Sequence, residues 1–266
     1  MKKNKLIYQV DAFTNQPFRG NPAGVCITDE MMPDEWMQNI AMEMNLSETA
    51  FLTRCNDGYN IRFFTPEAEV PLCGHATLSS AHILFESGMV SRAEKIHLNS
   101  KAGSLKATTI DNWVILDFPS YDLIPEELPS DLEEVTGGKP LEFLRSSNGW
   151  AFALFKDENE VRTLSPDFGR MRSSSFSDII VTAPSSDRNF DFCVRCFAPA
   201  LGINEDPVTG SAHCVLTPFW SARMGKTRLL SHQVSKREGI LKVELKGDRV
   251  EIAGQARTIL GGELLV

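Results

Sequence analysis

Hydrophobic and polar residues alternate along many short stretches of this chain, a pattern that predicts strands with one buried face. Two pairs of such stretches are joined by turn residues, Asp111-Asn112 and Gly247-Asp248, which predicts two hairpins. The other predicted strands are LIYQVDAF (6–13), AGVCI (23–27), ETAFLTR (48–54), IRFF (61–64), WAFALF (150–155), DIIVTAP (178–184) and FCVRCF (192–197).

Apolar residues recur at helical spacing in only three longer stretches. Residues 33–45 and 74–88 predict helices, and residues 210–225 predict a third with a kink or break at Pro218. Strands therefore outnumber helices, and hairpins join several of them. This favours an α+β fold in which a curled, mostly antiparallel, barrel-like sheet surrounds a central helix.

The pattern also repeats within the chain. Arg-x-Phe-x-Pro at 62–66 occurs again at 195–199, 133 positions later, and residues 102–116 align with 238–252 after a three-residue insertion. These two blocks and the match of Gly74 with Gly210 between them occur in the same order in each half, which predicts two pseudo-symmetric domains. We place them at 1–117 and 120–258, with a last strand near 259–266 that crosses back to complete the first.

The insertion brings Gly74 into register with Gly210, and each glycine opens a predicted helix. Either one alone is typical of an ordinary helix N-cap. Two matched helix N-termini that face one interdomain cleft would instead form an anion site, because their first N–H groups have no partner within the helix. We therefore take Gly74 and Gly210 as candidate ligand-binding residues.

Composition excludes several functional classes. A formal net charge of −8 disfavours a nucleic-acid partner but allows a small anionic substrate held by a local site. Apolar runs are far shorter than a membrane span needs, and the N-terminal pattern predicts an opening strand without a signal peptide, which indicates a cytoplasmic protein. The six cysteines are scattered, and Cys193 and Cys196 are interpreted as packed thiols in preference to a zinc pair.

Several motifs together resemble the phenazine-biosynthesis (PhzF-like) family, which has the diaminopimelate-epimerase-type fold. They are VDAFTNQPFRGNPAGVC, NLSETAFL, RFFTPEAEVPLCGHAT, RCFAPALGINEDPVTGSAH and GGELLV, and they extend from Val10 to the C-terminus. The resemblance implies two barrel-like domains, a homodimer, no metal and no organic cofactor. It also implies isomerisation of a cyclic amino-hydroxy acid by one glutamate, here Glu48, with His75, Asp206 and Ser211 lining the substrate.

The local pattern around Glu48 leaves two interpretations. Glu48 and Asn45 could form a capping box, N-x-x-E. Because ETAFLTR is typical of a strand and Asn45 fits the end of the preceding helix, we favour a carboxylate on an apolar strand. In a closed cleft its pKa should be raised, which suits a group that gives and takes a proton.

Three functions remain open at this point. The first is a cofactor-independent isomerase that moves a proton on one face of a small, cyclic carboxylic or amino acid. The second is a racemase or epimerase with two opposed thiols, which is disfavoured because Cys73 is matched by Thr209. The third is a small-molecule binding protein. His82 and His213 lack the companion ligands that a metal site would need, and the sequence does not specify the substrate.

Overall fold

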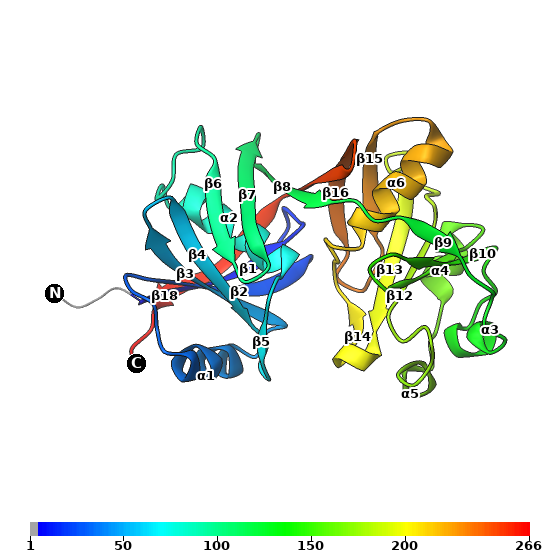
Figure 1. Cartoon of the computed structure of the whole chain (residues 1–266), viewed down its shortest axis with the longest axis horizontal. Helices are drawn as coiled ribbons and strands as arrows, with labels where there is room; N and C mark the ends of the chain where they lie inside the picture. The colour runs from blue at the N-terminus through cyan, green and yellow to red at the C-terminus, as the bar shows by residue number, and fades with distance from the viewer. Residues whose placement is uncertain (1–4) are drawn as a thin grey trace. The chain divides into compact units, whose positions relative to one another are not determined.

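The structure is a computed structural model that describes residues 5–266, and the chain divides into two compact units. The first unit contains the described residues up to Asp117 together with Ala253–Val266, and the second contains Phe118–Ile252. Residues 253–258, which the sequence pattern assigns to the second domain, therefore lie in the first unit. Both units combine mixed sheets with few helices (Figure 1).

The first unit contains strands that pair in both directions. β18, β1 and β2 are antiparallel neighbours, β3 joins β2 in parallel, and β4 pairs with β3 antiparallel and with β6 in parallel. The strands are β1 (Lys5–Ala12), β2 (Asn21–Thr28), β3 (Glu48–Cys55), β4 (Gly58–Phe64), β5 (Glu69–Val70), β6 (Ile96–Ser100), β7 (Gly103–Ile110), β8 (Trp113–Pro119) and β18 (Ala256–Glu263).

The second unit is built from shorter strands. β9, β10 and β11 are antiparallel neighbours, β12 joins β11 in parallel, and β13 pairs with β12 antiparallel and with β15 in parallel. The strands are β9 (Leu123–Pro125), β10 (Glu142–Ser146), β11 (Ala151–Leu154), β12 (Ile179–Pro184), β13 (Phe192–Ala198), β14 (Ile203–Asp206), β15 (Arg228–Gln233), β16 (Gly239–Lys246) and β17 (Arg249–Gly254).

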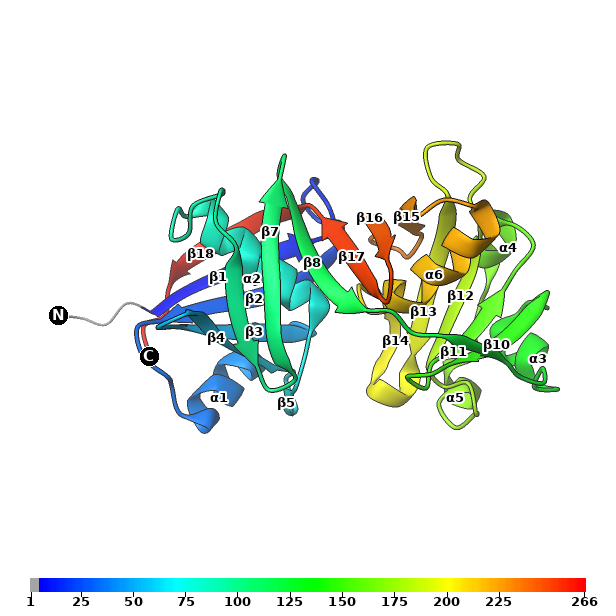
Figure 2. The ribbon, with the colours of Figure 1, turned by 45° about the horizontal axis from the view of Figure 1, so that its top comes forward.

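Two helices cover the sheet of the first unit. α1 (Asp34–Met44) packs on β3 and β4 through an apolar stripe that includes Met37 and Ile40 and meets Phe51. α2 (Gly74–Glu86) is buried along most of its length and packs on β1, β2, β3, β7 and β18 (Figure 2). The residues of α2 are mostly apolar or small, so the helix has no wide polar face. It is therefore buried on nearly all sides.

The second unit has four α-helices among its residues. α4 (Glu158–Thr163) packs on β12 and β13, and α6 (His213–Met224) packs on β15 and β16. The others are α3 (Leu132–Thr136) and α5 (Phe168–Met171), and a short 3₁₀ turn, η1 (Pro199–Leu201), precedes β14. Among residues 5–266, no helix is long and apolar enough to span a bilayer.

The predicted hairpins are confirmed, and their turns have the expected backbone. Asp111 and Asn112 have φ values of 48° and 67°, as a type I′ hairpin turn requires. In the second turn only Gly247, with a φ of 64°, has a positive value, as in a type II′ turn with glycine at its first central position. Of the two predicted effects of Pro218, a kink or a break, the break is wrong, because α6 continues through this residue. Proline has no N–H to donate to the carbonyl four residues earlier, and the Cys214 carbonyl instead accepts a hydrogen bond from the N–H of Tyr121, at 3.0 Å.

Candidate active site

Glu48 is the first residue of β3, and a short loop connects it to the C-terminal end of α1. Asn45 adopts the left-handed conformation at the C-cap of α1, with φ of 50°, and its N–H donates to the Ala41 carbonyl. The capping-box interpretation is therefore wrong, and the strand interpretation is confirmed. Side chains alternate along a strand, so Glu48 shares a face with Leu52, opposite the face on which Phe51 meets α1.

Glu48 lies beside an imidazole from the first turn of α2. Its Oε2 atom is 3.2 Å from Nε2 of His75, and the two side chains are only 16% and 9% exposed. The same Oε2 is buried and has no hydrogen bond to any residue between 5 and 266, so the contact has the distance of an ion pair without hydrogen-bond geometry. A buried polar atom left in this state is uncommon, and a catalytic role is one of its explanations.

Two further side chains contact His75. Sγ of Cys73 lies 3.4 Å from Nδ1, and Oγ of Ser47 lies 3.4 Å from Nε2. Cys73 is buried, as expected for a small packed residue, but the sequence did not indicate its contact with the imidazole. Ser47 was also missed, because serine before a strand carries no distinctive signal.

The N-terminus of α2 has no side-chain cap, and there is space beside its first residue. Cys73 occupies the N-cap position in an extended conformation and makes no capping hydrogen bond from its side chain. A Cβ atom added to Gly74 would meet nothing within 4 Å. Folding therefore does not require glycine at this position, whereas close approach of a ligand carboxylate to the backbone would.

Glu48, Cys73 and His75 are also the types of residue that bind metals. Their ligand atoms all lie within 4.8 Å of one another. However, Cys73 is nearest to Nδ1 and Glu48 to Nε2, and one ion can be bound by only one nitrogen of a ring. The arrangement therefore fits an acid/base cluster better than a metal centre.

The two cysteines of β13 are packed in the core. Cys193 and Cys196 are both fully buried, three residues apart on one strand. Such spacing places them on opposite faces of the sheet, and burial raises the pKa of the Cys193 thiol to about 12. The interpretation as packed thiols is confirmed.

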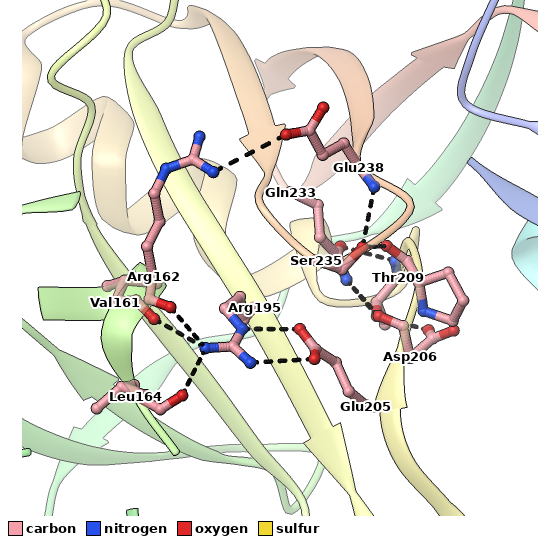
Figure 3. A network of polar contacts seen from close by, with 11 residues as sticks. Val161, Arg162, Leu164, Arg195, Glu205, Asp206, Thr209, Gln233, Ser235 and Glu238 are labelled. Atoms are coloured by element: carbon pink, nitrogen blue, oxygen red, sulfur yellow. Dashed lines mark hydrogen bonds and ion pairs between the residues drawn. The ribbon is translucent and has the colours of Figure 1, made fainter. Parts of the chain in front are cut away.

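Asp206, the last residue of β14, belongs to a polar network in the second unit (Figure 3). Its Oδ2 atom accepts a hydrogen bond from Oγ1 of Thr209, at 2.5 Å. The side chain of Gln233, fully buried on β15, spans the segment: Nε2 donates to the Asp206 carbonyl and Oε1 accepts from the Thr209 N–H, both at 2.8 Å. Oγ of Ser235 donates to the Pro207 carbonyl, at 2.7 Å. The segment 206–209 is thus held at three points.

Gly210 and Ser211 do not begin the helix, as the sequence pattern had suggested. They lie in a turn, and α6 starts at His213. The reason is local: Nδ1 of His213 donates to the Thr209 carbonyl, at 2.9 Å, while its backbone N–H donates to the Gly210 carbonyl, at 3.0 Å. The i→i−3 bonding tightens this entry. Burial lowers the pKa of His213 to about 4, and the neutral ring accepts from Oγ of Ser231 through Nε2.

An arginine on the central strand of each unit holds the segment that precedes the helix. Arg62 and Glu69 form two parallel hydrogen bonds of 2.7 Å, and Arg195 and Glu205 form the same pair at 2.7 and 3.0 Å (Figure 3). Each guanidinium also lies over a phenylalanine ring two residues along the strand. The repeated arginines were visible in the sequence, but their glutamate partners were not noticed.

Comparison with known proteins gives one consistent result. The family described as phenazine biosynthesis-like protein (PhzC-PhzF) matches residues 10–262. An uncharacterized isomerase from Halalkalibacterium halodurans is 48% identical over 98% of both chains. The crystal structure of a PhzF-family phenazine biosynthesis protein from Enterococcus faecalis superposes with a TM-score of 0.95 at 40% identity, covering 99% of this chain and 100% of that one.

A more distant likeness concerns the fold. A predicted epimerase from Pseudomonas aeruginosa has a TM-score of 0.75 at 19% identity, and the match covers 98% of this chain and 99% of that one. At this identity the likeness establishes the epimerase-type fold alone. The expected fold type is therefore confirmed.

Proposed function

Since the chain belongs to the phenazine biosynthesis-like (PhzC-PhzF) family and is an isomerase, we propose that it relocates a proton on a small, cyclic carboxylic or amino acid without a cofactor. Glu48 is the proposed acid/base. The observation that carries the proposal is the buried Oε2 atom of Glu48, which lacks a hydrogen bond and lies 3.2 Å from Nε2 of His75. A carboxylate oxygen with an unused lone pair can accept a proton directly from carbon.

In the proposed reaction, Glu48 removes a proton from a carbon of the substrate and returns it to another carbon. The adjacent His75 orients the carboxylate and hydrogen-bonds to it as its charge changes. The first N–H groups of α2, at Gly74 and His75, bind the substrate carboxylate. One acid/base works on one face of the substrate, so the product keeps the proton on that face.

We assign the remaining substrate contacts from the sequence pattern. Asp206 binds a substrate amine or a histidine, and Gly210 and Ser211 bind an anionic group. Support for Asp206 comes from the hydrogen bonds that fix its side chain and its carbonyl. Support for Gly210 and Ser211 comes only from their match to Gly74 and His75 in the repeat.

Racemisation by two opposed thiols is the main competing reaction. Thr209 stands where the second thiol would be needed, and its hydroxyl already donates to the Asp206 carboxylate. A hydroxyl is far too weak an acid to replace a thiol. A small-molecule binding protein is the other alternative, and it predicts ligand binding without proton exchange.

We further propose that the two units are two copies of one fold, each with its sheet curled around a central helix, and that the protein works as a cytoplasmic homodimer. The order of strand pairings around β2–β4 and β11–β13 supports the first point. Superposition of the two units in a crystal structure and sedimentation in solution would check these expectations.

The deciding experiment is deuterium incorporation. The protein is incubated in D₂O with a panel of small cyclic and acyclic carboxylic and amino acids, and loss of C–H signals is followed by NMR. For an acid that exchanges, Glu48→Gln should lower the rate about 10²–10⁴-fold while binding persists. Glu43→Gln, at an exposed position of α1, is the matched control.

The outcomes distinguish the alternatives. Exchange with inversion of configuration would favour a racemase, and binding of an acid without exchange would favour a binding protein. Near wild-type exchange by Glu48→Gln would overturn the role of Glu48, and Asp206 would become the next carboxylate to replace. Stability of Glu48→Gln should change little or increase, because an amide costs less than a carboxylate to bury.

A further inference from the structure

A cavity lies in the first unit, near the C-terminal end of α2. It has a volume of about 250 Å³, and its walls include His82, Glu86, Arg92, Asn112 and Arg257. His82 lies seven residues after His75 along α2, roughly 10 Å along the helix axis, so this cavity is separate from the Glu48 cluster.

The cavity wall carries more positive than negative charge. Arg92 and Arg257 contribute two guanidinium groups, and Glu86 contributes one carboxylate. Glu86 is already engaged, because its Oε2 accepts a hydrogen bond of 2.5 Å from Oγ1 of Thr258 and lies 3.5 Å from Nε2 of His82. The Glu86 carboxylate therefore already has partners in the cavity wall. The two guanidinium groups give the wall a net positive charge.

The two arginines differ in how they are held. Nη1 of Arg92 donates to Oδ1 of Asn112, at 2.8 Å, and Asn112 is fixed by its place in the turn between β7 and β8. Arg257 lies on β18, and its guanidinium group makes no hydrogen bond or ion pair with a side chain or carbonyl in the range 5–266. One guanidinium is thus positioned by the hairpin, and the other retains all its N–H donors for a ligand.

The pKa of His82 depends on the charged groups that line this cavity. Its side chain is 15% exposed, and Nε2 lies 3.2 Å from Oγ1 of Thr258. Burial lowers the pKa of His82, Glu86 opposes that shift, and Arg92 and Arg257 add to it. A bound anion would offset the two arginines and raise this pKa.

We propose that this cavity is a binding site for a small oxyanion, a carboxylate or a phosphate compound, held by the guanidinium groups of Arg92 and Arg257. Guanidinium groups recognise both kinds of oxyanion through paired, charge-assisted hydrogen bonds. The amide side chains of Asn112 and Gln255, also in the wall, provide further polar contacts. The site is independent of the reaction proposed for Glu48.

The test is an NMR titration of the His82 ring with succinate and, separately, with inorganic phosphate, at constant ionic strength. The wild-type protein should give a saturable shift and a raised pKa of His82 with at least one of them. Arg92→Ala combined with Arg257→Ala should weaken that binding at least about tenfold. Arg54→Ala combined with Arg188→Ala, both at exposed positions, should leave it unchanged.

Each result decides the matter. Saturation by succinate alone identifies a carboxylate site, and saturation by phosphate alone identifies a phosphate site. The proposal is overturned if neither anion saturates, or if the double variant binds as tightly as the wild type. If the alanine variant does not fold, the glutamine pair, Arg92→Gln with Arg257→Gln, keeps the side-chain stems and tests the same charges.

Discussion

The two units contain similar arginine–glutamate pairs but differ in the chemistry of the residues that follow them. In each, an arginine forms a bidentate pair with a glutamate just upstream of the helix, Arg62 with Glu69 and Arg195 with Glu205. The residues that follow diverge: the first unit presents Cys73 and His75 beside a buried glutamate, and the second presents Thr209 and Ser211 at the matching positions.

This difference bears on the one-sided reaction proposed for Glu48. Each unit contains an arginine–glutamate ion pair, so these pairs do not distinguish the units. Glu48 aligns with Val181 in the second unit, which cannot carry a proton. A carboxylate present in only one unit favours proton relocation on one face and disfavours inversion between two.

The largest expected effect comes from breaking the arginine pairs. Nη1 of Arg195 also donates to the Val161 and Leu164 carbonyls, at 3.0 Å each, so Arg195→Met leaves a partly buried carboxylate and two backbone acceptors without their partner. We expect a loss of roughly 3–5 kcal/mol in the free energy of unfolding. Arg62→Met should cost about 1–2 kcal/mol less, because its third partner, Asp34, is exposed. Urea denaturation measures both, and equal losses would show that the two pairs are energetically equivalent.

The next prediction concerns the amide that holds segment 206–209. Gln233→Leu leaves the Asp206 carbonyl and the Thr209 N–H without their partner in a buried site. We expect a loss of about 3–4 kcal/mol in the free energy of unfolding, since each orphaned group costs about 1–3 kcal/mol. Gln16→Leu, at an exposed position, should change stability by less than about 0.5 kcal/mol. Similar denaturation midpoints for the two variants would mean that Gln233 does not hold the segment.

The second unit should also contribute a pH-dependent term to the free energy of unfolding, through His213. Burial holds the pKa of His213 at about 4 in the folded state, below its ordinary value of 6.5. The unfolded chain therefore binds the proton first, and stability from neutral His213 is complete above about pH 6.5 and is lost as the pH falls toward 4. The loss should be about 3 kcal/mol.

The measurement is the free energy of unfolding at pH 7 and at pH 4 for the wild type and for His213→Gln. Between pH 7 and pH 4, the free energy of unfolding should fall by about 3 kcal/mol less in His213→Gln than in the wild type. His97→Gln in the first unit is the matched control. An unchanged pH dependence in His213→Gln would show that this histidine is not the group responsible.

The smallest effects concern two glycines of the first unit. A Cβ at Gly24 would lie 2.6 Å from Oγ1 of the buried Thr49, so Gly24→Ala should cost about 1–3 kcal/mol. Gly74→Ala meets no atom within 4 Å and should leave stability unchanged or raised by up to about 1 kcal/mol. If the substrate carboxylate approaches Gly74, the same variant raises KM on an identified substrate. Unchanged KM would remove Gly74 from the proposed site.

Much of the fold followed from local pattern, because alternation and turn chemistry act over a few residues. The strand beginning at Glu48 and the turn at Asp111-Asn112 were predicted for this reason. The start of α6 was not, because it depends on a hydrogen bond from the His213 ring to the Thr209 carbonyl that competes with the regular helix bond. Likewise, Gln233 acts on residues 24 positions earlier, and no spacing rule connects two such segments.

The pairing of β18 with β1 has a consequence for how the protein is made. β1 leaves the ribosome before the second unit, and β18 follows only after the entire second unit has been synthesised. Until then β1 has β2 on one side and an unpaired edge on the other, and such an edge can pair with other chains. The second unit, continuous in sequence, can fold as soon as it emerges. We therefore expect the nascent chain to acquire its structure in the reverse of its reading order, with the N-terminal sheet completed last.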